Sequence, residues 1–324
     1  MYVKSAVILA NCFALYVLLV FIVHAWWLAL PLAVLLGLAL ATAAFNIQHD
    51  GGHGAYSDRR WINKLASLTL DLLGGSSYVW ARKHNSIHHS YTNVSGHDDD
   101  INVGVLGRLS PHQRRLMMHR IQHFYLWVLY GFLPVKWHIY DDFHNVLTGR
   151  IGGHRFPRPK GWELVTFVGG KAIFFTLAIG LPLLLHPWWF VLAVYGMVSF
   201  IQGVALSVVF QMAHCVEGAD FPMPREGTGQ MENSWAAHQV ETTVDFARDN
   251  RLLSWFIGGL NFQIEHHLFP QICHVHYAAL AKLVERVCEE FKVKYSAHET
   301  FVAGVASHFL WLRRMGMTGK IASS

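Results

Sequence analysis

Histidine sets this sequence apart, because the 324 residues include 22 histidines and several of them fall into short clusters. Three clusters stand out, and their members are His49 with His53, His84 with His88 and His89, and Gln263 with His266 and His267. Residues four apart share one face of a helix, so each of the first two clusters brings a pair of imidazoles together. His89 is turned from His88 by about 100°, so these two neighbours can serve two different metal ions.

Clustered imidazoles indicate a metal site, because neutral imidazole is the commonest metal ligand in proteins and a hydrogen-bonded partner holds its tautomer. Carboxylates suited to that partner role lie within or shortly after the clusters: Asp50, Asp98, Asp99, Asp100 and Glu265. Eight or more imidazoles exceed the four ligands of one zinc ion, so two metal ions are expected. Nitrogen ligands alone suit zinc, copper or iron, and the type of metal stays open.

Histidines outside the clusters need separate interpretation. A lone histidine is more often a surface or core residue than a ligand, and we interpret eight in this way: His112, His119, His123, His138, His144, His186, His298 and His308. His214 follows a long apolar run directly and is expected to be a further ligand. For His238, beside Gln239 in a loop-like segment, the sequence leaves a ligand role open.

The composition indicates a membrane protein. Charged residues make up 15% of the chain, against roughly 25% in ordinary soluble domains, and hydrophobic residues make up 53%. Four apolar runs are long enough to cross about 30 Å of hydrocarbon as helices, and they cover 5–23, 26–45, 164–185 and 188–211. The first run is not expected to be a cleaved signal peptide, because a second run follows at once and no convincing cleavage site lies between them.

Charge asymmetry predicts the orientation in the membrane. The short turns around His24 and His186 lack Lys and Arg, whereas basic residues lie at the N-terminus, in 46–160 and after 212. The positive-inside rule therefore places all three clusters on the cytoplasmic side, with both termini inside. We expect an all-α, multi-pass integral membrane protein that forms a single domain over 1–324, with about four transmembrane helices, interfacial helices and a cytoplasmic helical cap holding a dimetal site.

The remaining segments carry weaker signals. Amphipathic or interfacial helices are expected at 56–80, 124–135 and 278–291, an apolar segment at 252–260 and a loop over 211–250. The four cysteines form no CxxC pair, so neither a disulfide framework nor a thiolate zinc site is expected. No nucleic-acid partner is expected, because the formal charge of +5 is not arranged as a basic stripe interleaved with exposed aromatic residues.

The three clusters match the pattern HxxxH, HxxxHH and QxxHH. With the flanking residues 88–93 and 262–270, and with Asp98 to Asp100, the chain resembles the membrane-bound fatty acid desaturases over nearly its whole length. Gln263, in place of a third-cluster histidine, is most similar to the front-end and bacterial acyl desaturases.

This resemblance implies an O2-dependent, non-haem centre of two Fe ions that converts two adjacent methylenes of an acyl chain into a double bond. The implied ligands are His49, His53, His84, His88, His89, His214, His266 and His267. Gln263 is expected as a weak ligand or a hydrogen-bond donor. An oxidising metal suits the reaction, because an unactivated C–H bond offers no acidic proton, and apolar walls can hold one methylene pair in place.

The resemblance also implies partners. The fatty acyl substrate is expected as acyl-CoA, on acyl carrier protein or linked to a lipid, and membrane lipid surrounds the protein. Many front-end desaturases carry a fused cytochrome b5 domain with an HPGG motif, which this chain lacks, so an external electron donor such as ferredoxin or cytochrome b5 is expected. The basic cytoplasmic surface suits an acidic carrier, although topology alone explains it equally well.

Two alternative functions stay open at this point. An acetylenase or hydroxylase would use the same scaffold, and spacing separates it poorly from a desaturase. A histidine-rich metal transporter belongs to a different class, but the ionisable groups of a conduction path should lie inside the spans rather than at one boundary. A purely structural membrane protein would leave the three clusters unexplained.

Overall fold

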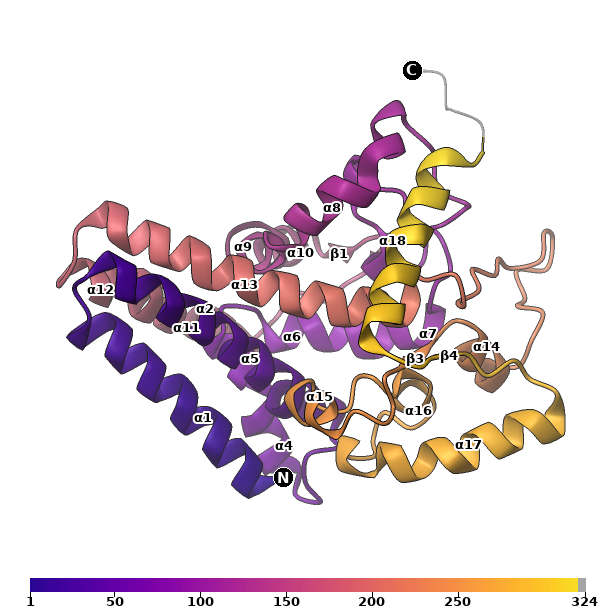
Figure 1. Ribbon diagram of the computed structural model, residues 1–324, viewed down its shortest axis with the longest axis horizontal. Coiled ribbons are helices and arrows are strands. Elements are labelled where there is room, and N and C mark those ends of the chain that lie inside the picture. The colour runs from indigo at the N-terminus through magenta and orange to yellow at the C-terminus, as the bar shows by residue number, and fades with distance from the viewer. Residues whose placement is uncertain (320–324) are drawn as a thin grey trace. The chain divides into compact units, whose positions relative to one another are not determined.

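The computed structural model describes residues 1–319, in which the chain forms two compact units. Unit 1 comprises residues 1–80, 129–149 and 156–207, and unit 2 comprises 81–128, 150–155 and the residues from 208 onward. Both units are built almost entirely from helices (Figure 1), which confirms the predicted all-α class.

Four helices of the described chain are long and apolar enough to cross a membrane, as predicted: Tyr2–Ile22, Trp26–His53, Trp162–Leu183 and Trp188–His214. Their component elements are α1 (Tyr2–Val17), η1 (Leu18–Ile22), α2 (Trp26–Ala43), η2 (Ala44–Gln48), α3 (His49–His53), α11 (Trp162–Phe175), η8 (Thr176–Gly180), α12 (Leu181–Leu183) and α13 (Trp188–His214). The second and fourth helices continue beyond the predicted runs. They end at His53 and His214, so predicted ligands lie on the ends of spanning helices.

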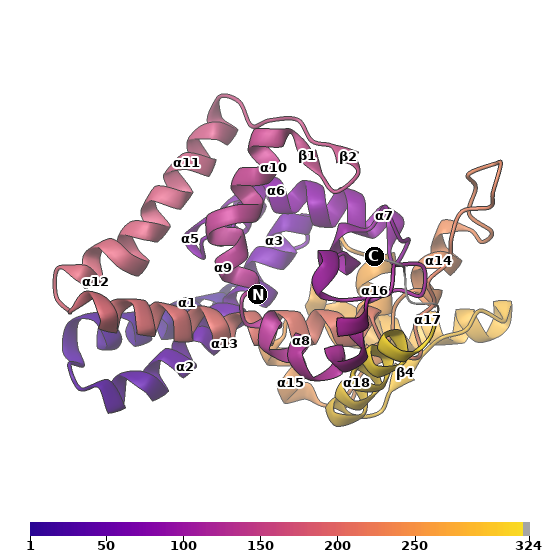
Figure 2. The same cartoon turned by 90° about the horizontal axis from the view of Figure 1, so that it is seen from above.

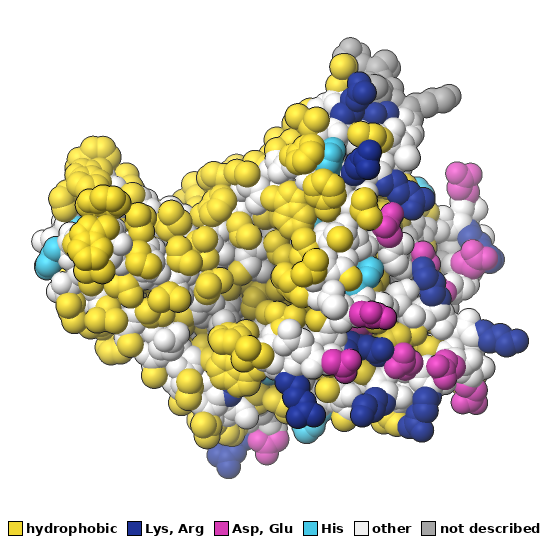
Figure 3. All heavy atoms as spheres, in the orientation of Figure 1, with side chains coloured by type: hydrophobic (Ala, Val, Ile, Leu, Met, Phe, Trp, Pro, Cys, Tyr) yellow, Lys and Arg dark blue, Asp and Glu magenta, His cyan; other side chains and the backbone are white. Residues whose placement is uncertain are grey.

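Helix packing in unit 1 depends on small and aliphatic residues. α1 packs along α2 (Figure 1), and Gly37 of α2 approaches α13 so closely that a Cβ atom there would lie 2.7 Å from the Val198 carbonyl oxygen. Small residues of this kind let spanning helices approach one another. The outer faces carry exposed apolar side chains such as Phe13 and Leu35, and Figure 3 shows hydrophobic side chains covering the surface over α1 and α2. Such faces suit hydrocarbon.

The two turns that lack Lys and Arg lie side by side in unit 1. The imidazole Nε2 of His186 lies 2.7 Å from the Val20 carbonyl oxygen, and the His186 and His24 rings have centroids 5.2 Å apart. The carbonyl can only accept, so Nε2–H donates this bond. His186 therefore has the structural role that the sequence suggested.

The prediction of a single interfacial helix at 56–80 is wrong. This stretch forms three short helices instead, α4 (Arg60–Ser67), α5 (Thr69–Leu72) and α6 (Ser77–Trp80). The chain breaks after α5 at Gly74, which has φ +91°, a conformation that L side chains rarely adopt. A Cβ atom at Gly74 would also lie 2.6 Å from the His138 ring, so glycine is needed there for space as well.

The apolar stretch 124–135 is likewise divided, into α8 (Gln122–Tyr130) and α9 (Leu133–Lys136), and η7 (Trp137–Asp141) and α10 (Asp142–Thr148) follow. The break includes Gly131, where a Cβ atom would collide with the ring of Phe200.

A buried ion pair joins several of these segments in unit 1. Lys171 of α11 is 5% exposed, and its Nζ donates to Asp142 Oδ2 at 2.7 Å, to the Gly74 carbonyl at 2.6 Å and to the Trp137 carbonyl at 2.9 Å. The three acceptors use all three protons of the ammonium group, as a buried charge requires. Lys171 therefore fixes the turn that follows α5.

Unit 2 contains mainly short helices: η3 (Ala81–His88), α7 (His89–Tyr91), η4 (Asp99–Ile101), η5 (Gly104–Leu106), η6 (Met117–Ile121), α14 (Trp235–Glu241), α15 (Arg251–Phe256), α16 (Gln263–Leu268), η9 (His274–His276), α17 (Tyr277–Phe291) and α18 (Phe301–Met317). Its strands are β1 (Arg150–Ile151) paired antiparallel with β2 (His154–Arg155), and β3 (Asp245–Phe246) paired parallel with β4 (Ala297–His298). α16 packs against α14 and α17 (Figure 2).

Predictions for unit 2 had mixed outcomes. The amphipathic helix at 278–291 is confirmed as α17. The loop over 211–250 is partly wrong, because it contains α14 and β3. Helix α18 was not predicted; its inner face is buried, and its carbonyls at Leu312 and Met315 accept hydrogen bonds from Gln122 and Arg108. Within residues 1–319, which include all four cysteines, the structure shows no disulfide.

Candidate metal centre

Six of the eight predicted histidine ligands lie together in unit 2, although they come from three separate parts of the chain. His84, His88 and His89 lie on η3 and α7, His214 is the last residue of α13, and His266 and His267 lie on α16. All six are buried, with at most 6% of each residue exposed. Ring centroids are 4.7 Å apart for His88 and His214, 5.0 Å for His88 and His267, and 4.7 Å for His89 and His266.

The helix that carries the second cluster is not the α-helix that was expected. Residues Ala81–His88 form a π-helix, whose i→i+5 hydrogen bonds also bring residues five apart onto one face. His84 and His89 accordingly face each other, with 3.3 Å between their Nε2 atoms, while the His84 and His88 rings stack with centroids 5.2 Å apart. Short π-helical segments occur frequently at functional sites.

Two of the groups in which ring nitrogens could hold a metal ion share His267. One group is His88, His214 and His267, the other is His89, His266 and His267, and within each group the nitrogens lie within 4.8 Å of one another. The adjacent residues His88 and His89 thus belong to different groups, as their angular separation on the helix suggested. Each group has the size of a site for one metal ion.

Hydrogen bonds from outside the groups hold the imidazole rings. Nδ1 of His88 lies 3.1 Å from Asp98 Oδ2, Nδ1 of His267 lies 2.8 Å from Gln239 Oε1, and Nδ1 of His266 lies 3.2 Å from the Tyr277 hydroxyl. Carboxylate and amide oxygens only accept, so Nδ1 of His88 and of His267 carries the proton. Nε2 is then the ligand nitrogen of both rings, the arrangement usual in metal sites.

Asp98 is itself fixed by its backbone surroundings. It is 2% exposed, its Oδ2 accepts from the Asn93 backbone N–H at 2.9 Å, and its Oδ1 accepts from the Asp100 backbone N–H at 3.0 Å. Asn93 has φ +59°, and its side-chain amide donates to the carbonyls of His214, Asp220 and Thr242 at 3.0–3.1 Å. This network ties the end of α13 to the segment that holds His88.

Burial and charge act differently on the two stacked histidines. Burial lowers the pKa of His84 below its ordinary value, although Asp100 opposes the shift. Burial also lowers the pKa of His88, but Asp98 and Asp100 together outweigh burial, and the net shift of this pKa is upward. Burial by itself raises the pKa of Asp100. The Lys83 ammonium, 3.2 Å away, and the two histidines have a larger opposite effect, so the net shift of this pKa is downward. The site therefore combines imidazoles with buried anionic oxygens that favour bound cations.

The predicted role of Glu265 as the hydrogen-bond partner of a histidine is wrong. Its Oε1 lies 3.0 Å from the Tyr295 hydroxyl, which lies 2.6 Å from Asp245 Oδ2, and Asp245 Oδ1 accepts from the backbone N–H of Ile264. Burial and the neighbouring Asp245 raise the pKa of Glu265 well above its ordinary value. Glu265 thus anchors α16 to the rest of unit 2.

Other polar residues have positioning roles. His238 lies with its Nε2 2.9 Å from the Thr92 carbonyl and belongs to neither group of three, so it connects α14 to the second cluster. Asp99 pairs with Lys83 at 3.0 Å. The roles of Gln239 and Tyr277 were not predicted from the sequence, because an uncharged side chain outside the histidine clusters gives no sign in a single sequence that it contacts them. A conserved position in aligned relatives is the signal that would find them.

The first cluster lies in unit 1. His49 and His53 are both 8% exposed, and their ring centroids are 4.8 Å apart on α3. The Trp80 ring packs edge-on against both, at 5.8 and 5.5 Å, and Gly52 is needed between them because a Cβ atom there would collide with that ring. The predicted pairing of these two imidazoles is therefore present within its own unit.

The donor atoms fit a metal. Nε2 of His88 and Oε1 of Gln263 are buried and have no hydrogen-bond partner among residues 1–319. A buried polar atom without a partner costs free energy, and a metal ion or its bound water would satisfy it. Imidazole nitrogens in two groups suit two borderline divalent ions, iron among them.

Comparison with known proteins decides the family, because residues 25–299 match the family model described as fatty acid desaturase. This chain belongs to the fatty acid desaturase family. It is 38% identical to the sn-1 linoleoyl-lipid 6-desaturase of Arthrospira platensis, over 98% of this chain and 86% of that protein. It is 37% identical to the protein of the same name from Synechocystis, over 98% and 88% of the two chains. An acyl-lipid (8-3)-desaturase of Physcomitrium patens is 40% identical over 98% of this chain and 67% of its own length.

Family membership confirms the resemblance drawn from the three histidine clusters. The chain is an oxidoreductase of fatty acid desaturation and a membrane protein. The matched region extends across both units, from α2 to the segment before α18.

Proposed function

We propose that this protein is an O2-dependent, di-iron desaturase that inserts a double bond into an acyl chain linked to a lipid. The observation that carries the proposal is the pair of buried histidine groups sharing His267, in which hydrogen bonds to Nδ1 leave Nε2 as the ligand nitrogen. A single-metal site or a structural role would not require two such groups.

The proposed iron ligands are the eight histidines of the three clusters and α13. Six come from unit 2, and the pair His49 and His53 of unit 1 completes the set in this proposal. Gln263 Oε1 is proposed as a weak ligand, directly or through water, because it is buried without a partner.

Iron held by these histidines would activate O2, which, with two electrons from the external donor, would be the oxidant that abstraction of hydrogen from an unactivated methylene requires. The protein's own residues orient the ligands and keep the site dry. Asp98, Gln239 and Tyr277 hold three imidazoles in place, and Asn93 holds the end of α13 against the second cluster. Burial of the imidazoles excludes water, which would otherwise compete with substrate and quench a reactive oxidant.

The proposed substrate is lipid-linked rather than a CoA or carrier-protein thioester, because the relatives named above act on linoleoyl-lipid and acyl-lipid. Electrons would come from an external donor such as ferredoxin or cytochrome b5. The absence of Lys and Arg from the turns at His24 and His186 supports a cytoplasmic location for the histidine clusters.

The test is expression with a panel of lipids, product analysis by mass spectrometry and iron determination on the purified protein. The expected result is iron bound by the chain, O2 consumption and a product lighter by two hydrogens. His88→Ala should abolish turnover. The control is His144→Ala, which should leave turnover unchanged, because His144 is an exposed residue of α10 whose ring stacks on Tyr140.

Other outcomes would identify the alternatives. Gain of one oxygen would indicate a hydroxylase, and loss of four hydrogens an acetylenase. Exchangeable zinc without O2 consumption would refute the desaturase proposal and favour a transporter.

A further inference from the structure

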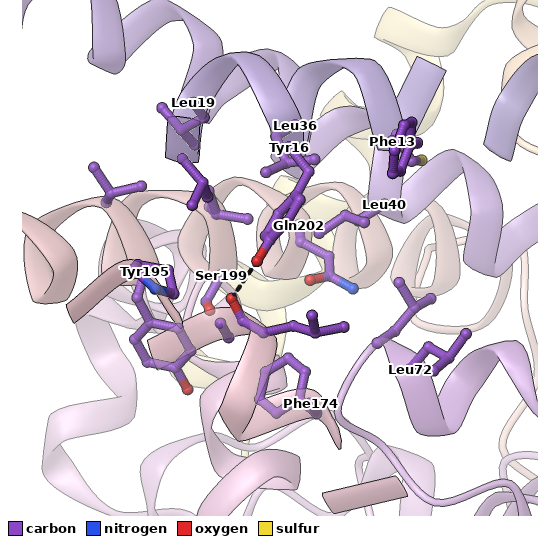
Figure 4. Close-up of a pocket in the computed structure, with 18 of the residues that line it drawn as sticks. Phe13, Tyr16, Leu19, Leu36, Leu40, Leu72, Phe174, Tyr195, Ser199 and Gln202 are labelled. Atoms are coloured by element: carbon purple, nitrogen blue, oxygen red, sulfur yellow. Dashed lines mark hydrogen bonds between the residues drawn. The ribbon is translucent and has the colours of Figure 1, made fainter. Parts of the chain in front are cut away.

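A cavity of about 330 Å³ lies within unit 1, among α1, α2, α5, α11 and α13 (Figure 4). Its walls are mainly hydrocarbon, and they include Phe13, Leu40, Leu72 and Phe174. An apolar cavity of roughly 150 Å³ holds one benzene ring, so this one has room for about a dozen carbon atoms. That is part of an acyl chain, and the surrounding elements are membrane-spanning helices whose natural neighbours are lipid chains.

Most polar side chains that line the cavity are already satisfied. The Tyr16 hydroxyl donates to the Leu177 carbonyl at 2.8 Å. His138 donates through Nε2 to the Leu73 carbonyl at 3.1 Å and accepts at Nδ1 from the Tyr195 hydroxyl at 2.9 Å. These groups stabilise the walls and have no need of a ligand.

Gln202 differs from them. It is 5% exposed, and Figure 4 shows its amide reaching into the cavity between Tyr16, Leu40 and Phe174. The hydrogen bonds described above for the lining of the cavity are made by Tyr16, His138 and Tyr195, and none of them involves the Gln202 amide. An amide in a hydrocarbon environment without a partner costs about 1–3 kcal/mol, so an apolar side chain would be the stable choice unless something binds there.

The depth of Gln202 restricts what that partner can be. It lies fourteen residues after Trp188 and twelve before His214, near the middle of α13. At about 1.5 Å per residue it is some 18–21 Å from either end of the helix. The ester carbonyls of lipids lie at the membrane boundary and do not reach this depth. A carbon–carbon double bond within an acyl chain does, and its π electrons can accept a weak hydrogen bond, whereas a saturated methylene cannot.

We propose that this cavity binds the middle or distal part of an acyl chain and that the Gln202 amide selects chains that already contain a cis double bond. Gln202 is then a specificity-determining residue. Assigning the chain to the substrate rests on the proposed function, whereas the cavity and the amide that faces it do not. An unsaturated acyl chain in the cavity can come from a second source, which is the tail of a bilayer lipid that remains bound to the protein.

The experiment compares wild-type protein with Gln202→Met, which keeps the length of the side chain and removes the amide. Ile201→Met is the matched control, because Ile201 is the preceding residue of α13 and does not line the cavity. Each protein receives an equimolar mixture of two lipids whose acyl chains have equal length and differ only in a distal cis double bond. Product ratios are measured by mass spectrometry, and the lipids that co-purify with each protein are analysed in parallel.

If the substrate chain occupies the cavity, wild type and Ile201→Met prefer the unsaturated lipid, and Gln202→Met loses about two- to fivefold of that preference. This range corresponds to an N–H···π contact of about 0.5–1 kcal/mol at roughly 1.4 kcal/mol per tenfold. If a bilayer lipid occupies it, the product ratio is unchanged, and the co-purified lipids of Gln202→Met shift toward saturated chains.

Unchanged product ratios together with unchanged co-purified lipids would overturn the proposal. If wild-type protein makes no desaturated product at all, the proposed function fails, and the co-purified lipids alone still decide whether the Gln202 amide selects unsaturated chains.

Discussion

Asp98→Asn tests the reasoning about the metal centre most directly, because it changes one atom and leaves every predicted ligand in place. Asp98 accepts three hydrogen bonds, from His88 Nδ1, the Asn93 backbone N–H and the Asp100 backbone N–H. Asparagine offers a single oxygen, so its amide nitrogen must face at least one of these donors. If it faces His88, the ring adopts the opposite tautomer and Nε2, the ligand nitrogen, carries the proton.

The expected effect on iron binding is large for so small a change. Loss of a hydrogen-bonding partner of a metal-ligating histidine typically reduces metal affinity by about 10- to 100-fold, or roughly 1.4–2.8 kcal/mol. Asp98 and His88 are both almost fully buried, so water cannot replace the lost bond, and the upper half of this range is expected. Desaturation should fall in parallel with iron content.

The assay is competition for iron between the protein and a chelator of known affinity, with iron content and turnover measured on the same samples. The matched control is Asp99→Asn, the same substitution one residue later, at a partly exposed side chain that pairs with Lys83. Asp99→Asn should change iron affinity less than about twofold, because exposed or half-exposed ion pairs contribute little. Wild-type iron affinity in Asp98→Asn would refute the proposed role of His88 Nε2 as a ligand nitrogen.

Three further predictions concern separate parts of the chain. His266→Ala should abolish turnover and lower iron content, and full activity would contradict its assignment as a ligand. Gln263→His should retain iron and change the rate of desaturation, because an imidazole replaces a buried amide oxygen; identical kinetics would show that Gln263 is peripheral. Lys171→Met should destabilise the protein by roughly 3–5 kcal/mol in thermal unfolding, since Asp142 keeps a buried charge without its partner. Adding Asp142→Leu should recover most of that loss, and no recovery would show that the ion pair is not the cause.

The features that depend on local chemistry can be predicted from the amino-acid sequence alone. Four apolar runs are visible as spanning helices because hydrocarbon tolerates neither charges nor unpaired backbone groups over that length. The histidine clusters and the nearby Asp98 are visible because imidazole is rare and its spacing follows the helical repeat. Family membership followed from these short motifs, since each combines unusual residues at fixed separations.

Which of these groups lie together, and which residues hold them in place, depends on the tertiary structure. Gln239 and Tyr277 orient His267 and His266 across the packing of α16 with α14 and α17, and neither carries a charge or a motif. The division of 56–80 into short helices depends on the space left by His138 at Gly74, which no local propensity encodes. Gln202 is one of several polar residues in a mainly apolar helix, and only the packing of that helix against its neighbours shows that its side chain faces a cavity. Contacts between residues distant along the chain depend on how the elements pack, and a single sequence records composition and local periodicity but not that packing.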